Sequence, residues 1–341
     1  MKFAVLGMGR TGHAMAAYLM ARGCSVTVWT RDPGKRSAIK AGGITVTGEI
    51  EGHFTPAVAE TVQSALAEAG YILVMTTAEG HRPLAQQMRG ALRPGQRILI
   101  FNCNWGAFEF WNILGQENQN TIIAETSGML LMSQMEAPRS CYLKAVKEHI
   151  GIAAIPNTDS GLLCTELAGV FPQFYKAGNV LETSLNVTNP IIHAAVNLFN
   201  LSAIENGQDF FMYQDAATPL AVRLAETLDA ERLAVMAKMG LHGVSCKDIL
   251  NQAWRSTSES LLRILKDNKS YQRAKGANGV HHRHFTEDIP YGLMPVQALG
   301  KRFQVPTPAI NTVIRCFELA LDLRLADQMP DLSGLRIEDF L

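Results

Sequence analysis

The most constraining feature of this chain is a glycine cluster close to its start. Residues 2–6 (KFAVL) form a short apolar run, and residues 7–12 (GMGRTG) follow it directly. An alanine- and methionine-rich segment comes next, and residues 25–29 (SVTVW) are rich in β-branched side chains. A strand, a G-x-G-x-x-G turn, a helix and a second strand within about 30 residues make a βαβ unit. This order predicts a parallel sheet covered by helices.

The spacing of the three glycines predicts a dinucleotide site. Gly7 permits the tight turn, Gly9 lets the backbone approach a pyrophosphate, and Gly12 lets helix and strand pack closely. The start of the helix offers N–H groups and a positive dipole end to the phosphates. We therefore expect a Rossmann-type domain whose phosphate-binding turn consists of Gly7, Met8, Gly9, Arg10, Thr11 and Gly12.

The end of the second strand bears on the choice between NADP and NAD. An NAD site usually carries an acidic residue there, which accepts hydrogen bonds from the ribose 2′-hydroxyl. This chain has Thr30 and Arg31 instead, with Lys35 and Arg36 one turn later. These cations favour the 2′-phosphate of NADP. In the alternative, the cations are solvated loop residues and Asp32 performs the acid's role after a shift of one position, so that NAD is bound.

Further apolar runs extend the predicted sheet. Residues 71–77, 97–104 and 121–126 are typical of strands, residues 44–54 of a hairpin in the same sheet, and residues 142–156 of an extension of it. Ligands of such sheets lie beyond the carboxyl ends of the strands. The cofactor contacts expected from these ends are Thr76, Thr77, Ala78, Asn102 and Glu125.

The pattern becomes helical after about residue 185. Helical periodicity covers residues 189–205, 218–240, roughly 247–267 and the stretch from 307 towards the C-terminus, whereas residues 281–300 show no helical period. A chain of 341 residues is also long for one core. We thus expect an α/β chain with a dinucleotide-binding Rossmann domain at 1–184 and an all-α domain at 185–341.

The first of these helices carries an uncharged polar row. Residues 189–190 (NP) predict its start, with asparagine as the N-cap. His193, Asn197 and Asn200 follow at helical spacing, and the segment has no charged residue before Glu205. One interpretation is an ordinary amphipathic helix with a narrow wet face. A water-facing row usually carries charges, however, so the row also fits the wall of a cleft.

Three segments together resemble the opine dehydrogenases, the family that includes the octopine and nopaline dehydrogenases. They are the glycine fingerprint at residue 7, N-x-x-N-P-x-x-H at 186–193 and R-x-F-T-E-D-I-P-Y-G at 283–292. The resemblance implies a helical domain like that of 6-phosphogluconate dehydrogenase. It also implies NADP- or NAD-dependent reductive condensation of an amino acid with a 2-oxo acid, and the reverse oxidation of a secondary amine dicarboxylate.

The same resemblance assigns roles to particular residues. His193 and Asp288 would form the catalytic pair, and Arg283 would bind a substrate carboxylate, with Asn197 and Asn200 along the same wall. From the sequence alone, Asp288 has an alternative interpretation as an acidic cap for the turn or helix that Pro290 begins. Two other functions stay open: a 2-oxo acid reductase of the ketopantoate reductase type, and a non-catalytic NADP(H)-sensing protein. Those reductases use a lysine where this chain has His193.

Charge and composition argue against other classes of protein. Lysine plus arginine and aspartate plus glutamate both total 31, so no basic field attracts nucleic acid. No apolar run reaches membrane-spanning length, and the N-terminus lacks a signal-peptide pattern. The six cysteines lack CxxC spacing, and the histidines of residues 281–284 (HHRH) stand too close together for a zinc site. We expect a cytoplasmic enzyme without metal that binds small molecules, and the resemblance implies a homodimer.

Overall fold

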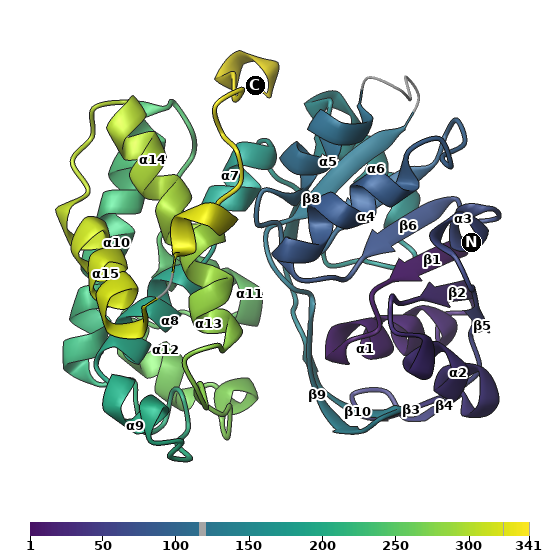
Figure 1. Cartoon of the computed structure of the whole chain (residues 1–341), viewed down its shortest axis with the longest axis horizontal. Helices are drawn as coiled ribbons and strands as arrows, with labels where there is room; N and C mark the ends of the chain where they lie inside the picture. Colours follow the sequence, from purple (N-terminus) through teal and green to yellow (C-terminus); the bar gives the residue numbers. More distant parts are fainter. Residues whose placement is uncertain (116–120, 323, 341) are drawn as a thin grey trace. The chain divides into compact units, whose positions relative to one another are not determined.

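The computed structural model describes residues 1–115, 121–322 and 324–340. The chain divides into two compact units, one formed by Met1–Thr183 with Phe340 and the other by Ser184–Asp339. The labelled strands in Figure 1 all belong to the first unit, and the second unit is built from helices. This confirms the predicted α/β domain followed by a helical domain. No helix in the described part of the chain is both long and apolar enough to cross a membrane.

The described residues of the first unit form an eight-stranded sheet of order β12-β11-β8-β7-β6-β1-β2-β5. The strands from β8 to β5 in that order are parallel neighbours, while β11 runs antiparallel to β8. The carboxyl ends of β1, β6, β7 and β8 therefore lie at one edge. The strands are β1 (Lys2–Leu6), β2 (Ser25–Trp29), β5 (Ala57–Val58), β6 (Tyr71–Val74), β7 (Arg97–Ile100), β8 (Ile122–Thr126), β11 (Ile150–Ile155) and β12 (Phe174–Lys176).

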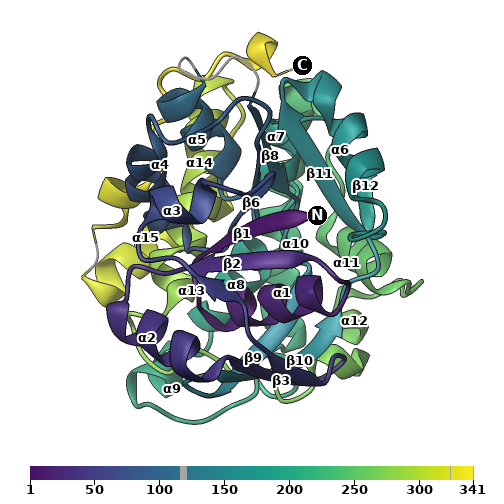
Figure 2. The same ribbon diagram turned by 90° about the vertical axis from the view of Figure 1, so that its right-hand side faces the viewer.

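A second sheet packs on the other side of helix α1. Its order among the described residues is β4-β3-β10-β9, and α1 lies between the two sheets (Figure 2). Its strands are β3 (Ile44–Gly48), β4 (Gly52–Phe54), β9 (Leu131–Ala137) and β10 (Ser140–Val146). The predicted hairpin at 44–54 is thus confirmed, but its assignment to the main sheet was wrong. Residues 142–156 likewise divide between the second sheet (β10) and the main sheet (β11). An alternating pattern of apolar and polar residues indicates a strand, but it does not indicate which strands pair with it.

The helices of the first unit follow its strands. Helix α1 buries most of its length, because small and apolar side chains face both sheets. Helix α2 begins at Pro33, and the Asp32 carboxylate caps it by accepting from the backbone N–H of Lys35 at 3.1 Å. The helices are α1 (Arg10–Met20), α2 (Pro33–Gly42), α3 (Val62–Leu66), α4 (His81–Met88), α5 (Gly106–Leu114) and α6 (Ser160–Leu167), with a 3₁₀ turn η1 (Ala78–Gly80) before α4. Helix α7 (Val180–Leu185) begins in the first unit and ends in the second.

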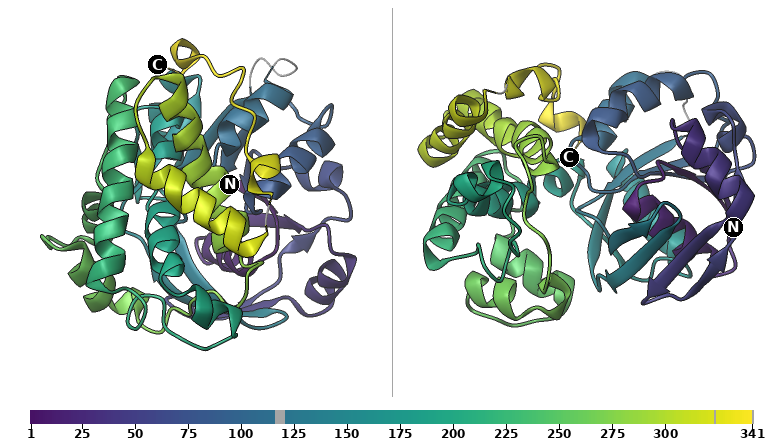
Figure 3. Two further views of the ribbon diagram at one scale, coloured as in Figure 1. Left: turned by 60° about the vertical axis from the view of Figure 1, so that its left-hand side comes forward. Right: turned by 60° about the horizontal axis from the view of Figure 1, so that its bottom comes forward.

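The second unit consists of helices, which Figure 3 shows in colours from teal (α8) to yellow (α15). Thr218 caps α10 by accepting from the backbone N–H of Ala221, as its position before Pro219 predicts. The elements are α8 (Asn189–Leu198), α9 (Leu201–Glu205), α10 (Pro219–Lys238), α11 (Cys246–Trp254), α12 (Leu261–Asp267), α13 (Arg283–Thr286), the π-helical turn η4 (Ile289–Leu293), α14 (Met294–Arg302) and α15 (Pro308–Leu321).

Predictions for three segments of this unit were wrong in part. The single helix expected at 189–205 is broken, because the Asn200 side chain donates to the carbonyl of Val196 at 2.7 Å and so competes with the helical hydrogen bond. Its N-cap is Thr188, one residue before the predicted one. The segment 247–267 is interrupted after Arg255, whose φ is +48°. Residues 281–300, expected to lack helix, contain α13, η4 and most of α14.

Candidate functional site

The turn after β1 has the shape that a pyrophosphate requires. Gly7 has a φ of +108°, and a Cβ added there would lie 2.9 Å from the carbonyl carbon of Met75. A Cβ on Gly12 would collide with the carbonyl oxygen of Gly7, whereas a Cβ on Gly9 would meet no described atom within 4 Å. No described side chain caps α1, and its first turn carries no acidic residue. The turn therefore presents backbone and a helix N-terminus to open space, which fits a dinucleotide phosphate.

The neighbouring strand ends contribute polar groups at the same edge. Thr76 follows β6, and its hydroxyl is buried without a hydrogen-bond partner in the described residues. Thr77 precedes the 3₁₀ turn that begins at Ala78. Asn102 follows β7 in a left-handed conformation, with a φ of 77°. An unpartnered buried hydroxyl beside the glycine turn fits a bound ligand, and the contacts of these residues with a cofactor stay predictions.

Glu125 has a structural task. Its side chain is fully buried; one carboxylate oxygen accepts from the Thr183 hydroxyl at 2.7 Å and the other from the backbone N–H of Ala107 at 2.9 Å. The carboxylate thus satisfies the first turn of α5, where a negative charge is favoured by the helix dipole. Glu125 is therefore bonded to the protein itself, and its contact with a cofactor stays a prediction.

The residues after β2 divide into structural and exposed groups. Arg36 donates from Nη1 to the carbonyl oxygen of Thr30 at 2.6 Å, and this bond fixes the backbone at the end of β2. Asp32 is occupied as the N-cap of α2. Arg31 and Lys35 are exposed, and no hydrogen bond or ion pair of their side chains is seen among the described residues. The cations rather than the acid are therefore available to a ligand here.

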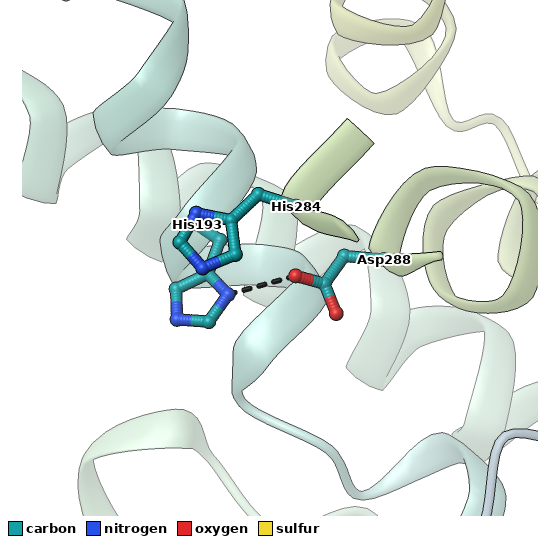
Figure 4. Close-up of side chains that lie close together, drawn as sticks. All are labelled: His193, His284 and Asp288. Carbon is teal, nitrogen blue, oxygen red and sulfur yellow. Dashed lines mark hydrogen bonds and ion pairs between the residues drawn. The ribbon is translucent and has the colours of Figure 1, made fainter. Parts of the chain in front are cut away.

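His193 and Asp288 meet in the second unit although 95 residues separate them. His193 lies in the middle of α8, and Asp288 lies at the turn between α13 and η4. The two side chains form a hydrogen bond of 2.7 Å between Nδ1 and a carboxylate oxygen, drawn in Figure 4. Both are buried, with exposed fractions of 8% and 4%. A shielded imidazole–carboxylate pair of this kind fixes the tautomer and the orientation of the ring.

The other nitrogen of His193 faces a residue that the sequence did not single out. Nε2 lies 3.2 Å from the hydroxyl of Tyr213. Burial, and after it the neighbouring Tyr271 and Asp288, raises the pKa of Tyr213 well above its ordinary value. The phenol is therefore protonated and donates to Nε2, while Nδ1–H donates to Asp288. Tyr213 stands in an irregular segment between α9 and α10, where no periodicity or motif could have revealed it.

A second histidine packs against the pair. The ring of His284 stacks on that of His193 with centroids 4.0 Å apart and planes 30° apart (Figure 4). Asn197, which is fully buried, donates from its amide to Nδ1 of His284 at 3.2 Å. Asn197 therefore orients a ring beside His193. The other end of the amide, Oδ1, is buried without a hydrogen-bond partner among the described residues, and the substrate contact of Asn197 stays a prediction.

Arg283 and Asn200, which were also predicted to bind substrate, both contact other residues of the chain. Arg283 forms an ion pair of 3.0 Å with Glu287, and a third of its side chain stays exposed. The ion pair occupies Nε of Arg283, so the two terminal nitrogens of the guanidinium are the groups that can contact a ligand. Asn200 bonds the carbonyls of Val196 and Ala216, which makes it a connector of backbone segments. Its predicted place in one row with His193 was wrong, because α8 ends before it.

The first asparagine of the segment 186–193 also has a structural role. Asn186 bonds Arg232, the carbonyl of His242 and the backbone N–H of Val244. Arg232 is itself buried and paired with Asp229 at 2.6 Å. A fully satisfied buried network of this kind fixes the packing of its elements. It holds the chain that leads into α8 against α10 and the segment after it.

His193, His284 and Asp288 together offer potential metal ligands, with ligand atoms within 4.8 Å of one another. Lone pairs on ring nitrogens lie in the ring plane, so two stacked rings direct them side by side rather than to one point. The Asp288 oxygen is also bonded to His193, and Nδ1 of His284 is bonded to Asn197. The arrangement therefore suits proton transfer better than metal binding.

Family models match both parts of the chain. The alpha-helical domain of NAD/NADP octopine/nopaline dehydrogenase matches residues 176–321, and ketopantoate reductase matches residues 3–106. The first match covers the segment that contains His193, Tyr213 and Asp288. The second covers the glycine turn and the strands beside it.

Similar proteins extend this result over nearly the whole chain. An opine dehydrogenase from Arthrobacter sp. (strain 1C) is 30% identical over 94% of this chain and 90% of its own length. Two solved structures share the fold: an octopine dehydrogenase with NADH and agmatine (TM-score 0.77, 17% identity, 94% and 89% coverage) and a yersinopine dehydrogenase with NADP⁺ (TM-score 0.75, 15% identity, 99% and 96% coverage). The chain therefore belongs to the opine dehydrogenase family of NAD(P)-dependent oxidoreductases.

Proposed function

We propose that this enzyme condenses an amino acid with a 2-oxo acid and reduces the product at the expense of NADPH. The amine attacks the carbonyl carbon, water leaves, and the resulting imine carbon accepts a hydride while its nitrogen keeps a proton. A secondary amine dicarboxylate results. When bound, the reduced nicotinamide supplies that hydride. The observation that carries this proposal is the His193–Asp288 pair, because every other step of the reaction moves a proton near neutral pH.

His193 acts through Nε2 in this proposal. As a base it accepts a proton from the ammonium of the amino acid, and as an acid it returns the proton to the oxygen that leaves as water. Asp288 keeps the other proton on Nδ1 and stabilises the imidazolium between these steps. The Tyr213 hydroxyl occupies Nε2 in this structure, so substrate must either take the place of that bond or exchange its proton through the hydroxyl.

The proposed carboxylate contact is Arg283. Its pairing with Glu287 aims the guanidinium and leaves the outer N–H groups for a planar, bidentate partner. We assign the phosphates of the cofactor to the turn at residues 7–12, and the adenosine 2′-phosphate to Arg31 and Lys35. The structure supports NADP(H) over NAD(H) in one respect: Asp32 is committed to capping α2.

The experiment is an oxidation assay with NADPH and with NADH, using pyruvate in the presence and absence of a panel of amino acids. We expect oxidation only when both substrates are present, and faster with NADPH. Oxidation with pyruvate alone would instead establish a 2-oxo acid reductase. Cofactor binding without oxidation, over a wider set of 2-oxo acids, would identify a cofactor-sensing protein.

We also propose that the enzyme works in the cytoplasm as a homodimer. The cysteines at positions 24, 103, 141, 164, 246 and 316 are all free, which suits a reducing compartment. The dimer follows from the family resemblance alone. Light scattering on the purified protein measures its mass directly, and a monomer at assay concentration would refute this part of the proposal.

A further inference from the structure

A lysine without a carboxylate partner lies at the carboxyl edge of the main sheet. Lys147 follows β10, and its backbone N–H donates to the carbonyl of Leu130 at 3.0 Å, beside the loop that follows β8. Its ammonium lies over Gly128, where an added Cβ would be 3.6 Å from Nζ. Of the acidic side chains in residues 1–115, 121–322 and 324–340, none forms an ion pair with it. Lys147 is half-buried, and a partly desolvated cation of this kind is stabilised by an anionic ligand.

The titratable groups near Lys147 do not compensate its charge. Cys103, on the loop after β7, is the one that interacts with the ammonium among the described residues, and burial lowers the pKa of Lys147 to about 8. Glu125 is fully used by Thr183 and α5. Glu148 is exposed, and His149 packs against Tyr175.

The two loops that flank the ammonium are tied together. Four consecutive residues, 102–105, have φ between 38° and 77°, a left-handed run that costs energy in non-glycine residues. The backbone N–H of Asn102 donates to the Thr126 hydroxyl at 3.3 Å, and that hydroxyl donates to the carbonyl of Gly128 at 2.8 Å. These bonds fix the loop after β7 to the loop over which Lys147 lies. Backbone held in such a conformation is typical of binding sites.

The position of Lys147 along the edge indicates which anion it meets. The adenosine end of a dinucleotide is recognised after β2 and the pyrophosphate after β1, so the nicotinamide end extends over β6, β7 and β8. With strands about 4.8 Å apart, β7 and β8 lie about 10–14 Å from the glycine turn, which is too far for the pyrophosphate. The carbon that accepts a hydride must lie against the nicotinamide. In a 2-oxo acid, the carboxylate is bonded to that carbon.

We propose that Lys147 binds the carboxylate of the 2-oxo acid substrate. This inference rests on the proposed function, and it names a further substrate-binding residue. The inference also assigns the two substrate carboxylates to different residues. Lys147 binds the carboxylate of the 2-oxo acid, and Arg283 binds the carboxylate of the amino acid.

The test is a titration of the enzyme–NADPH complex with oxamate, an unreactive isostere of pyruvate, followed by NADPH fluorescence or calorimetry. Lys147→Met keeps the apolar stem and should weaken oxamate binding about 10- to 100-fold, the range for a charged hydrogen-bond partner. Lys147→Arg keeps the charge and should retain binding within a few-fold. The matched control is Lys176→Met, which removes an exposed lysine on β12 and should leave the affinity unchanged.

The pH dependence gives a second, independent readout. The cationic form binds the anion, so the affinity of the wild-type complex for oxamate should be constant below pH 8 and fall about tenfold per pH unit above it. Lys147→Arg should abolish this fall up to pH 10, because a guanidinium stays charged there. A wild-type profile that is flat up to pH 10 would overturn the proposal.

The remaining outcomes separate this inference from the proposed function. Unchanged oxamate affinity in Lys147→Met, with an unchanged KM for the 2-oxo acid that supports turnover, overturns the inference and leaves the function standing. An equal loss of NADPH affinity in that variant assigns the lysine to the cofactor and also overturns it. Lysine-dependent oxamate binding without amino-acid-dependent turnover supports the carboxylate site while refuting the proposed reaction.

Discussion

The hydroxyl of Tyr213 lies 3.2 Å from Nε2 of His193, the ring nitrogen that the Asp288 carboxylate does not hold. A donor at this position stabilises the neutral ring, which is the form that acts as a base. Tyr213→Phe removes this donor and keeps the ring. We expect kcat/KM to fall about 3- to 10-fold, the equivalent of one ordinary hydrogen bond.

Tyr271→Phe is the matched control for that change. Tyr271 is buried, its ring packs on that of Tyr213 with centroids 4.6 Å apart, and its hydroxyl accepts from Nε1 of Trp254 at 3.0 Å. Both variants remove one buried hydroxyl from the same aromatic cluster. The control should lose stability without a comparable fall in kcat/KM. Equal kcat/KM values for Tyr213→Phe and the wild type would show that the contact with His193 has no role in its proton transfer.

The His193–Asp288 pair makes the strongest prediction about activity. His193→Ala should lower kcat about 10²- to 10⁴-fold, because it removes the group that transfers protons. Asp288→Asn should lower kcat by a comparable factor, because an amide neither enforces the Nδ1–H tautomer nor stabilises the imidazolium. NADPH fluorescence checks that both variants still bind cofactor. His281→Ala, in the same histidine-rich segment, should leave kcat near the wild-type value.

The first unit could be predicted largely from local signals. The strand, glycine turn and helix of residues 2–20 specify one another through turn chemistry and periodicity, and the structure confirms them. What the sequence could not supply is the sheet to which a strand belongs. Residues 44–48 alternate in the same way whichever sheet they join, and only the packing of α1 between two sheets decides it.

The candidate site was predictable only through resemblance. His193 and Asp288 carry no local signal that they meet, since their bond depends on how α8 and η4 pack. Tyr213 and Lys147 were missed because both stand outside regular motifs. Asn197 and Glu125 were assigned to ligands because polar groups at helix faces and strand ends often contact them. In the structure both are buried and bonded to the protein itself, although Oδ1 of Asn197 lacks a partner among the described residues, and both assignments stay predictions.

Cofactor preference can be tested at the end of β2. Arg31 is exposed, whereas Asp32 is bonded to the backbone N–H of Lys35. Arg31→Ala should weaken NADPH about 10- to 100-fold and NADH by less than twofold, because only NADPH carries the 2′-phosphate. Asp32→Ala should cost about 1 kcal/mol of stability through the lost helix cap and affect both cofactors equally. A selective loss of NADH binding in Asp32→Ala would establish the NAD interpretation instead.

His81, at the start of α4, should govern part of the stability in acid. Burial lowers its pKa to about 4, and neither ring nitrogen has a hydrogen-bond partner among the described residues. In the unfolded chain this imidazole is protonated below about pH 6.5, whereas in the folded protein it stays neutral down to about pH 4. The unfolded state therefore binds more protons in this range, and the free energy of unfolding falls as the pH drops from 6.5 to 4. The shift corresponds to about 3 kcal/mol.

His81→Leu should therefore remove about 3 kcal/mol of the difference in unfolding free energy between pH 7.5 and pH 4, measured by urea titration. At pH 7.5 the variant should be as stable as the wild type or more so, because it replaces two unpartnered buried nitrogens by apolar surface beside Phe110. His149→Leu, which changes an exposed histidine, should keep the wild-type acid dependence. If His81→Leu and the wild type lose stability in parallel between these pH values, the imidazole of His81 is protonated in the folded protein and its surroundings must open to admit water.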